Sequence, residues 1–245
     1  MVKKRATSNS DGQPTIRPKS SLRKGRSDNI DHVARQPLQA RSAERFEKIL
    51  TAAEELLQKS NIEDISFYDI ARQAKISPAS VNYLFPTSAA LRIELNRRYL
   101  PISTEFAIES QSSLVKFRNP SWQHWLYEMG SQVRQHYNAN RHISETILGP
   151  ALHRETQREA IDQNRRVAET LVASLRKVFI LPEIPGLVED FAYAIDVVDA
   201  LFGRSYVKKG TIDDQTFDKA IRMQIAYLRT ILPETLSLLP DEENE

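Results

Sequence analysis

Cysteine is absent from the 245-residue chain, and glycine is scarce, with seven residues. Without cysteine, the chain forms neither a disulfide framework nor a thiolate metal site. Few glycines and few strand-like runs, together with many segments rich in Ala, Glu, Lys, Leu and Arg, favour an all-α fold. A chain of this length can bury a large core in one or two domains.

Long hydrophobic runs are also missing. The most apolar segment, Phe191 to Phe202, contains Asp196 and Asp199, so we predict no membrane span. No hydrophobic segment lies near the N-terminus, so we predict no signal peptide and expect a cytoplasmic protein. Gly-rich phosphate loops and the HExxH and GxSxG motifs are absent, and the histidines are scattered. We therefore predict no enzyme, no cofactor and no metal site.

Charge is unevenly distributed, although the net charge is only +2. Residues 1–37 carry nine Lys or Arg and three Asp, which gives 9 − 3 = +6, and lack apolar periodicity. We expect them to form a disordered basic arm, in contact with DNA phosphates or simply solvated. Residues 233–245 carry five acids and no base, and form the predicted acidic tail.

The stretch from Ile65 to Phe85 predicts two short helices joined by a tight turn. Ser66 is suited to cap the first helix, and Asp69 completes a capping box. Ser77 is suited to cap the second, with Pro78 at its first helical position. The apolar spacing of the second helix leaves four side chains facing outward: Ala79, Ser80, Asn82 and Tyr83.

This outward face is small and uncharged, as a helix entering the major groove of DNA requires. Asn pairs with adenine, Ser bonds to several bases, and Tyr reaches a phosphate. Two helices at a steep angle with a short turn are typical of a helix-turn-helix. From this stretch alone, any helical hairpin in a bundle remains an alternative.

A supporting helix is predicted from Arg41 to Lys59 by an apolar stripe with helical spacing. It carries I-L-x-A-A-x-x-L-L, and I-S-F-Y-D-I-A-x-x-A-x-I-S-x-x-S-V-N-Y-x-F-P-T-S-x-A-L follows. Together they resemble the DNA-binding domain of the TetR family of transcriptional regulators, over Arg41 to Leu95. The resemblance implies a DNA-binding head at 38–98 with its reader at 65–84, and an all-helical regulatory and dimerisation domain at 99–232.

The resemblance also implies a function and its partners. We expect a homodimeric repressor that binds a palindromic operator in double-stranded DNA and responds to a small-molecule effector. The expected DNA-binding residues are Arg41, Ser66, Phe67, Ser77, Ala79, Ser80, Asn82, Tyr83, Thr87 and Ser88. An architectural DNA-binding protein without an effector is the main alternative. A small helical enzyme is another, although no nucleophile–base pair supports it.

Several positions depart from the usual family pattern: Lys75, Ala79, Asn82, Leu84 and Ser88. Lys75 stands in the turn where members often have glycine, and Ser88 stands where a phosphate-contacting lysine is common. The hydroxyls and backbone N–H groups of Thr87 and Ser88 are expected to substitute. Residues 41–86 hold six bases and seven acids, so this part of the chain has no excess of positive charge. We therefore expect the N-terminal arm to attract DNA together with three arginines of the next helix, Arg92, Arg97 and Arg98. The alternative is that these arginines form a solvated helix face.

In the regulatory domain we expect a helix over 89–100 that Pro101 kinks or breaks, then helices over 121–137, 141–148 and 151–179, and two more after Gly186. An apolar ligand pocket is expected, with core packing as the alternative, at Phe106, Phe117, Trp122, Trp125, Tyr127, Met129 and His142. By the resemblance, the last two helices form the dimer interface through Phe191, Ile195, Val198, Phe202, Phe217, Ile221 and Leu228; a monomeric core is the alternative. Three acids on this apolar surface suit either a cationic ligand or polar pairing at the interface: Glu189, Asp196 and Asp199.

Overall fold

A computed structural model describes residues 33–114, 121–150 and 154–239 of the chain. From Leu100 to the end of α4, it describes the side chains of Ile102, Glu105 and Phe106 only. The described residues form α-helices joined by loops and one 3₁₀ turn. The helices are α1 (Ala40–Leu57), α2 (Phe67–Ala74), α3 (Pro78–Leu84), α4 (Ser88–Leu114), α5 (Trp122–Ala139), α6 (Arg141–Ile147), α7 (Arg154–Arg176), α8 (Leu187–Lys209) and α9 (Asp214–Leu228).

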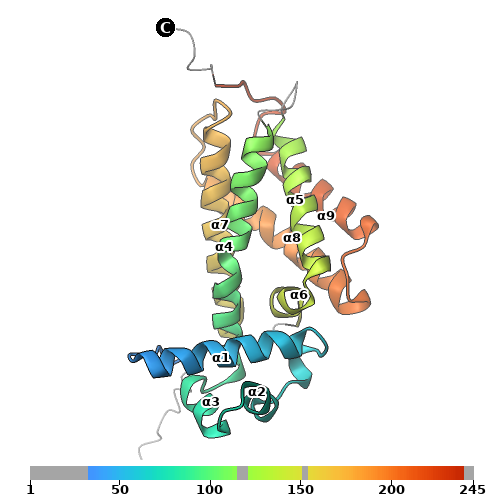
Figure 1. The fold of residues 1–245 in the computed structure, drawn as a ribbon. Helices are drawn as coiled ribbons and strands as arrows, with labels where there is room; N and C mark the ends of the chain where they lie inside the picture. Colours follow the sequence, from blue (N-terminus) through green and yellow to red (C-terminus); the bar gives the residue numbers. More distant parts are fainter. Residues whose placement is uncertain (1–32, 115–120, 151–153, 240–245) are drawn as a thin grey trace, which may run out of the picture.

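The first three helices form a head at one end of the molecule. In Figure 1, α1 lies across the base of the regulatory domain, and α2 and α3 lie below it. The apolar stripe of α1 is buried, and its Phe46 ring stacks on Phe85, with 4.7 Å between ring centroids. Aromatic stacking of this kind adds about 0.5–1.5 kcal/mol beyond area burial, so it fixes the end of α3 against α1.

Local capping defines the reader as the sequence predicts. Ser66 Oγ accepts a hydrogen bond from the Asp69 N–H at 3.2 Å, and an Asp69 carboxylate oxygen accepts one from the Ser66 N–H at 3.1 Å. This is a complete capping box. Lys75 ends α2 in the left-handed region, at φ 56° and ψ 44°. The turn therefore adopts a conformation that favours glycine, although the residue is lysine.

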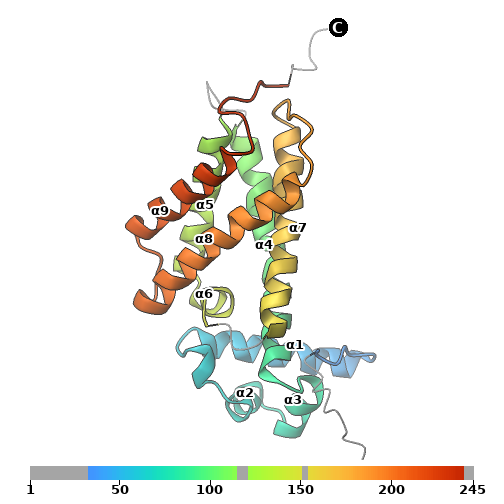
Figure 2. The ribbon, with the colours of Figure 1, turned by 180° about the vertical axis from the view of Figure 1, so that it is seen from behind.

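The helix α4 joins the head to the regulatory domain without a break. It runs through Pro101 to Leu114, so the prediction of a helix that ends at residue 100, broken by Pro101, is wrong. An interior proline removes one backbone hydrogen bond and costs about 3 kcal/mol. Packing of α4 along α7, which lies beside it in Figures 1 and 2, offsets this cost.

Two hydrophobic clusters fill the interior. The first runs from the head through the start of α4 and through α6 to the lower parts of α8 and α9, and includes Phe85, Leu95 and Phe202. The second lies at the far end of the domain and includes Trp122, Trp125 and Phe191. Because the first cluster crosses the boundary at residue 98 that the sequence suggested, head and regulatory domain share one core.

Short segments at both ends of the described chain are part of the fold. Residues 33–37 pack on the head: Ala34 is buried, and the Arg35 N–H donates to the Leu84 carbonyl at 2.8 Å. For these residues the expectation of disorder is wrong, and residues 1–32 lie outside the described residues. At the other end, Leu238 forms an antiparallel bridge with Phe179, and the Trp122 indole N–H donates to the Pro233 carbonyl at 3.0 Å. The predicted acidic tail thus begins as a docked segment.

No helix in the described ranges is both long and apolar enough to cross a membrane.

Candidate nucleic-acid interface and internal cavity

The reader helix α3 presents a small, uncharged outer face. Ala79 and Asn82 are exposed, and Tyr83 is 60 % exposed. Ser77 Oγ caps the helix by accepting from the Ser80 N–H at 3.3 Å, and the two Ser hydroxyls are 2.9 Å apart. The Asn82 amide nitrogen donates to the Pro78 carbonyl at 3.0 Å. This face can enter a major groove without desolvating a charge.

Arg35 adds a positive charge beside this face. Its guanidinium lies over the Tyr83 ring, 4.7 Å from the centroid. A cation–π contact at an exposed site contributes about 0.5–1 kcal/mol. Sequence reasoning counted Arg35 within a disordered arm and missed this contact, because the segment before α1 has no apolar periodicity that would place it.

The other predicted DNA-contacting residues border the reader. Arg41 is exposed in the first turn of α1, and Ser66 caps α2. Thr87 Oγ1 accepts from the Ala90 N–H at 3.1 Å, so it caps α4, and Ser88 is exposed at the first position of that helix. Phe67 is different, because it is half-buried and packs against the core of the head.

The three arginines of α4 do not form a free basic surface. Arg92 is 6 % exposed and donates to the backbone carbonyls of Thr146, at 2.9 Å, and of Gly149, at 2.8 Å. Arg97 pairs with Glu94 and Glu159, and Arg98 with Glu47 and Glu54. The expectation that they attract DNA is therefore wrong. Arg92 instead neutralises the carbonyl end of α6, where orphan carbonyls favour a cation.

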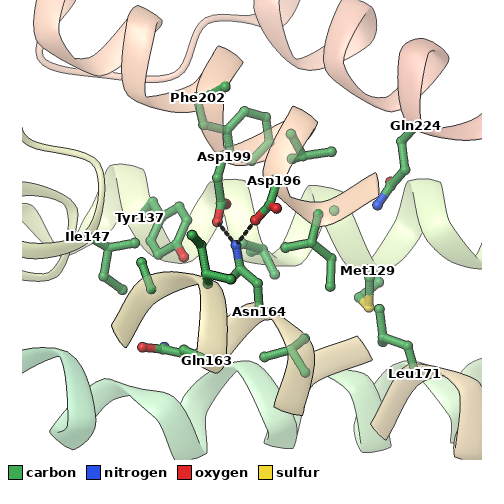
Figure 3. Close-up of a pocket in the computed structure, with 18 of the residues that line it drawn as sticks. Met129, Tyr137, Ile147, Gln163, Asn164, Leu171, Asp196, Asp199, Phe202 and Gln224 are labelled. Carbon is green, nitrogen blue, oxygen red and sulfur yellow. Dashed lines mark hydrogen bonds between the residues drawn. The ribbon is translucent and has the colours of Figure 1, made fainter. Parts of the chain in front are cut away.

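A cavity of about 470 Å³ lies in the regulatory domain among α4, α5, α6, α7, α8 and α9, and it opens to solvent beside α7, where the lining residue Ile161 is 58 % exposed. Its apolar lining includes Met129, Leu171 and Phe202. Figure 3 shows Asn164, on α7, directed toward Asp196 and Asp199, both on α8. The Asn164 amide nitrogen donates to Asp196 at 2.8 Å and to Asp199 at 2.9 Å. One amide thus holds two carboxylates in a largely apolar cavity.

The electrostatics of this trio reflect its burial. Burial raises the pKa of Asp199 to about 6; the Asn164 hydrogen bond opposes that rise, and the neighbouring Asp196 adds to it. Tyr137, on α5, also lines the cavity, and burial together with the charge of Asp199 raises the pKa of its hydroxyl. A positive charge placed here would favour the ionised form of Asp199.

The short helix α6 lies between the cavity and the head. Ile147 of α6 lines the cavity. On the other side, a Glu145 carboxylate oxygen accepts from the Ile62 N–H at 2.9 Å, and Arg141 donates to the Asn61 side-chain oxygen at 2.8 Å. His142 hydrogen-bonds Gln58 at 2.5 Å. These contacts join α6 to the end of α1 and to the turn that follows it.

Solved structures of transcriptional regulators share the overall fold. A TetR-family transcriptional regulator from Streptomyces coelicolor matches with a TM-score of 0.56 at 19 % identity, over 77 % of this chain and 99 % of that one. SmeT, the repressor of the Stenotrophomonas maltophilia multidrug efflux pump SmeDEF, gives 0.52 at 14 %, over 81 % and 95 %. RolR in complex with resorcinol gives 0.52 at 14 %, over 78 % and 89 %. This chain has the fold of a TetR-family regulator. No family model and no curated protein matches its sequence.

Within this TetR fold, the cavity is not where the aromatic residues predicted it. Of the expected pocket residues, only Met129 lines it. Trp122 and Trp125 are buried in the far hydrophobic cluster, where both indoles fill space. Three more lie elsewhere: Phe106 packs edge-on against His136, Tyr127 against Phe217 and His142 against Tyr99. Phe117 is outside the described residues.

The expected dimer-interface residues are already used inside the subunit. Six of them are buried within the single chain: Phe191, Val198, Phe202, Phe217, Ile221 and Leu228. Ile195 is half-buried and lines the cavity. These residues therefore pack within the subunit, as the alternative of a monomeric core would have them.

Other residues of α8 and α9 are exposed, and several of them are apolar. Tyr193 is 55 %, Val207 61 % and Met223 53 % exposed, and Ala226 is exposed as well. We call these four residues the α8–α9 outer face; Ala200 is also exposed but lines the cavity. Figure 2 shows α8 and α9 next to each other on one side of the TetR fold.

Metal ligands do not cluster in the described part of the chain, where no group of three or more His, Cys, Asp or Glu side chains could hold an ion.

Proposed function

We propose that this chain is a homodimeric DNA-binding transcriptional repressor whose affinity for DNA is controlled by a small molecule in the cavity. The observation that carries the proposal is the outer face of α3, since it combines exposed Asn82 and Tyr83 with capped, small neighbours and no charge penalty. The fold supports it, because SmeT is described as a repressor and RolR is seen with a bound ligand. Its site of action would be the cytoplasm, where the DNA is.

Two heads are needed for a palindromic operator. We place the dimer contact on the α8–α9 outer face, because exposed Tyr193, Val207 and Met223 form an apolar surface that a monomer leaves in water. A two-fold axis through this face would present two copies of α3 to half-sites about one helical turn, or a multiple of it, apart.

Control by a ligand follows from the position of α6. A molecule that fills the cavity contacts Ile147 and α4, and α6 is hydrogen-bonded to the head through Glu145, Arg141 and His142. Such a ligand shifts the spacing of the heads only as far as it binds one arrangement more tightly than the other. Ligand binding and operator binding are therefore coupled reciprocally.

Selection of bound sites from random DNA tests this function, with sedimentation velocity to give the stoichiometry. The proposal predicts enrichment of a palindrome bound by two subunits. An α3 variant with Ser80→Ala and Asn82→Ala should select a palindrome that has lost its base preference at the positions these side chains contact, whereas the matched variant Thr51→Ala, exposed on α1, should select the unaltered palindrome. Recovery of random sequence by the unaltered protein would instead indicate an architectural DNA-binding protein.

A further inference from the structure

We infer that the cavity takes a protonated amine carried on an apolar body; this rests on the proposed function, in which the cavity holds the effector. The inference concerns the chemical class of that molecule. It depends on three observations: the lining, the unneutralised carboxylates, and a buried acceptor without a partner.

The lining of the cavity indicates that most of the ligand is apolar. Side chains of Met129, Val133, Leu171, Ile195 and Phe202 meet around about 470 Å³. Cavities of this size and character bury most of the surface of a small organic molecule. A hydrated sugar or a nucleotide would lose its water here without enough polar partners to replace it.

The two carboxylates in the cavity indicate that the ligand carries a positive charge. Asp196 and Asp199 form no ion pair with any described residue, and no Lys, Arg or His is among the described residues that line the cavity. Asn164 satisfies one lone pair of each carboxylate but carries no charge. Both residues are half-buried, and a carboxylate that has lost part of its hydration is ordinarily stabilised by a cation. The missing counter-charge is the one that a cationic ligand supplies.

A third hydrogen-bond acceptor in the cavity, the side-chain oxygen of Asn96 on α4, favours a ligand that carries an N–H donor. Asn96 lines the cavity and is 5 % exposed, yet its side-chain oxygen has no hydrogen-bond partner among the residues that the structure describes. A buried acceptor left unpaired costs about 1–3 kcal/mol. An ammonium N–H satisfies an acceptor of this kind, whereas a quaternary ammonium has no N–H to donate. A protonated amine therefore fits the polar groups better than a permanently methylated cation.

Ligands that share one apolar scaffold and differ only in their polar group test whether the cavity prefers a positive charge. We would measure binding to the DNA-free protein by isothermal titration calorimetry at pH 7.5. The first series is adamantane-1-methylamine, the corresponding alcohol and adamantane-1-carboxylate. The second series carries the same amine, alcohol and carboxylate groups on a biphenyl scaffold. On at least one scaffold, the amine should bind at least about tenfold more tightly than the alcohol, and the carboxylate should not bind.

Variants locate the effect. The double variant Asp196→Asn and Asp199→Asn should abolish the preference for the amine, and circular dichroism would confirm that it folds. Glu189→Gln, on the same helix but exposed, should retain the preference. The inference is overturned when no amine binds better than its alcohol, including the case in which neither binds. It is also overturned when Mg²⁺ alone binds at the carboxylates.

The proposed function fails separately from this inference. A neutral or anionic ligand that fills the cavity and releases operator DNA would overturn the amine while leaving the regulator intact. Tight amine binding by a protein that selects no DNA site would do the reverse.

Discussion

The carboxylate of Glu145 accepts a hydrogen bond from the backbone N–H of Ile62 at 2.9 Å, across the junction between regulatory domain and head. Glu145 is 3 % exposed, and its other oxygen accepts from the Tyr206 hydroxyl at 2.6 Å. One buried side chain thus connects α8, α6 and the turn after α1. The hydrophobic core is continuous here as well, so polar and apolar contacts both join the head to the regulatory domain.

Replacing Glu145 with Ala should lower the free energy of unfolding by about 2–4 kcal/mol. The change leaves the Ile62 N–H and the Tyr206 hydroxyl buried without an acceptor, and hydrogen bonds to charged groups are stronger than average. Urea denaturation followed by circular dichroism measures the loss. Glu44→Ala is the control, because the exposed Glu44–Lys48 pair should contribute less than about 1 kcal/mol. Equal losses for both variants would contradict the role of Glu145.

Lys75→Gly should stabilise the protein by about 0.5–1 kcal/mol. The left-handed conformation costs a residue with a Cβ about 1–2 kcal/mol, and glycine removes that cost but returns part of it as unfolded-state entropy. Lys75→Ala is the matched control, because it also removes the charge but keeps the Cβ. The account expects a higher melting temperature for the glycine variant only; equal melting temperatures would show that the turn carries no strain.

Asp199→Asn should stabilise the ligand-free protein, and more so at pH 7.5 than at pH 5. The folded pKa of this acid is raised to about 6 from an ordinary 3.8. Folding therefore favours its protonated form, and stability is lost as pH rises through this window. The facing groups on the packed helices are Asp196 and Tyr137, with the uncharged Asn164. The stabilisation by Asn should grow by about 1 kcal/mol between the two pH values. A pH-independent difference would contradict the shift.

Tyr193→Asp should convert the dimer to a monomer and weaken operator binding, because it buries a charge in the proposed contact. Sedimentation velocity measures the first effect and fluorescence anisotropy with labelled DNA the second. Ile180→Asp is a matched control, since Ile180 is 52 % and Tyr193 55 % exposed. A Tyr193 variant that remains dimeric would exclude the α8–α9 outer face as the interface.

Local signals predicted the head well. The capping box at Ser66, the cap at Ser77 and the stripe of α1 depend on neighbours within a few residues, so the sequence carries them directly. The passage of α4 through Pro101 was not predictable in the same way, because the packing that offsets the proline comes from α7, about sixty residues later in the chain.

In the regulatory domain, the sequence did not indicate which side of each helix faces the core. Periodicity identified apolar stripes on α8 and α9 but did not tell the core side from the partner side, so Phe202 and Phe217 were assigned to an interface although they fill the subunit. Charge was misleading in the same way: Arg92 reads as a surface residue in sequence, yet three backbone carbonyls surround it. The cavity residues Asn164 and Asn96 gave no sequence signal, since their roles depend on distant partners.

The most direct test of the central claim, that the outer face of α3 reads base pairs, is the binding-site profile of Asn82→Ala beside that of the unaltered protein. Asn82 is exposed on α3, and a bidentate Asn–adenine pair discriminates by about 1–3 kcal/mol. The account predicts that the variant loses its preference at one base pair in each half-site and retains it elsewhere. An unchanged profile would contradict the claim.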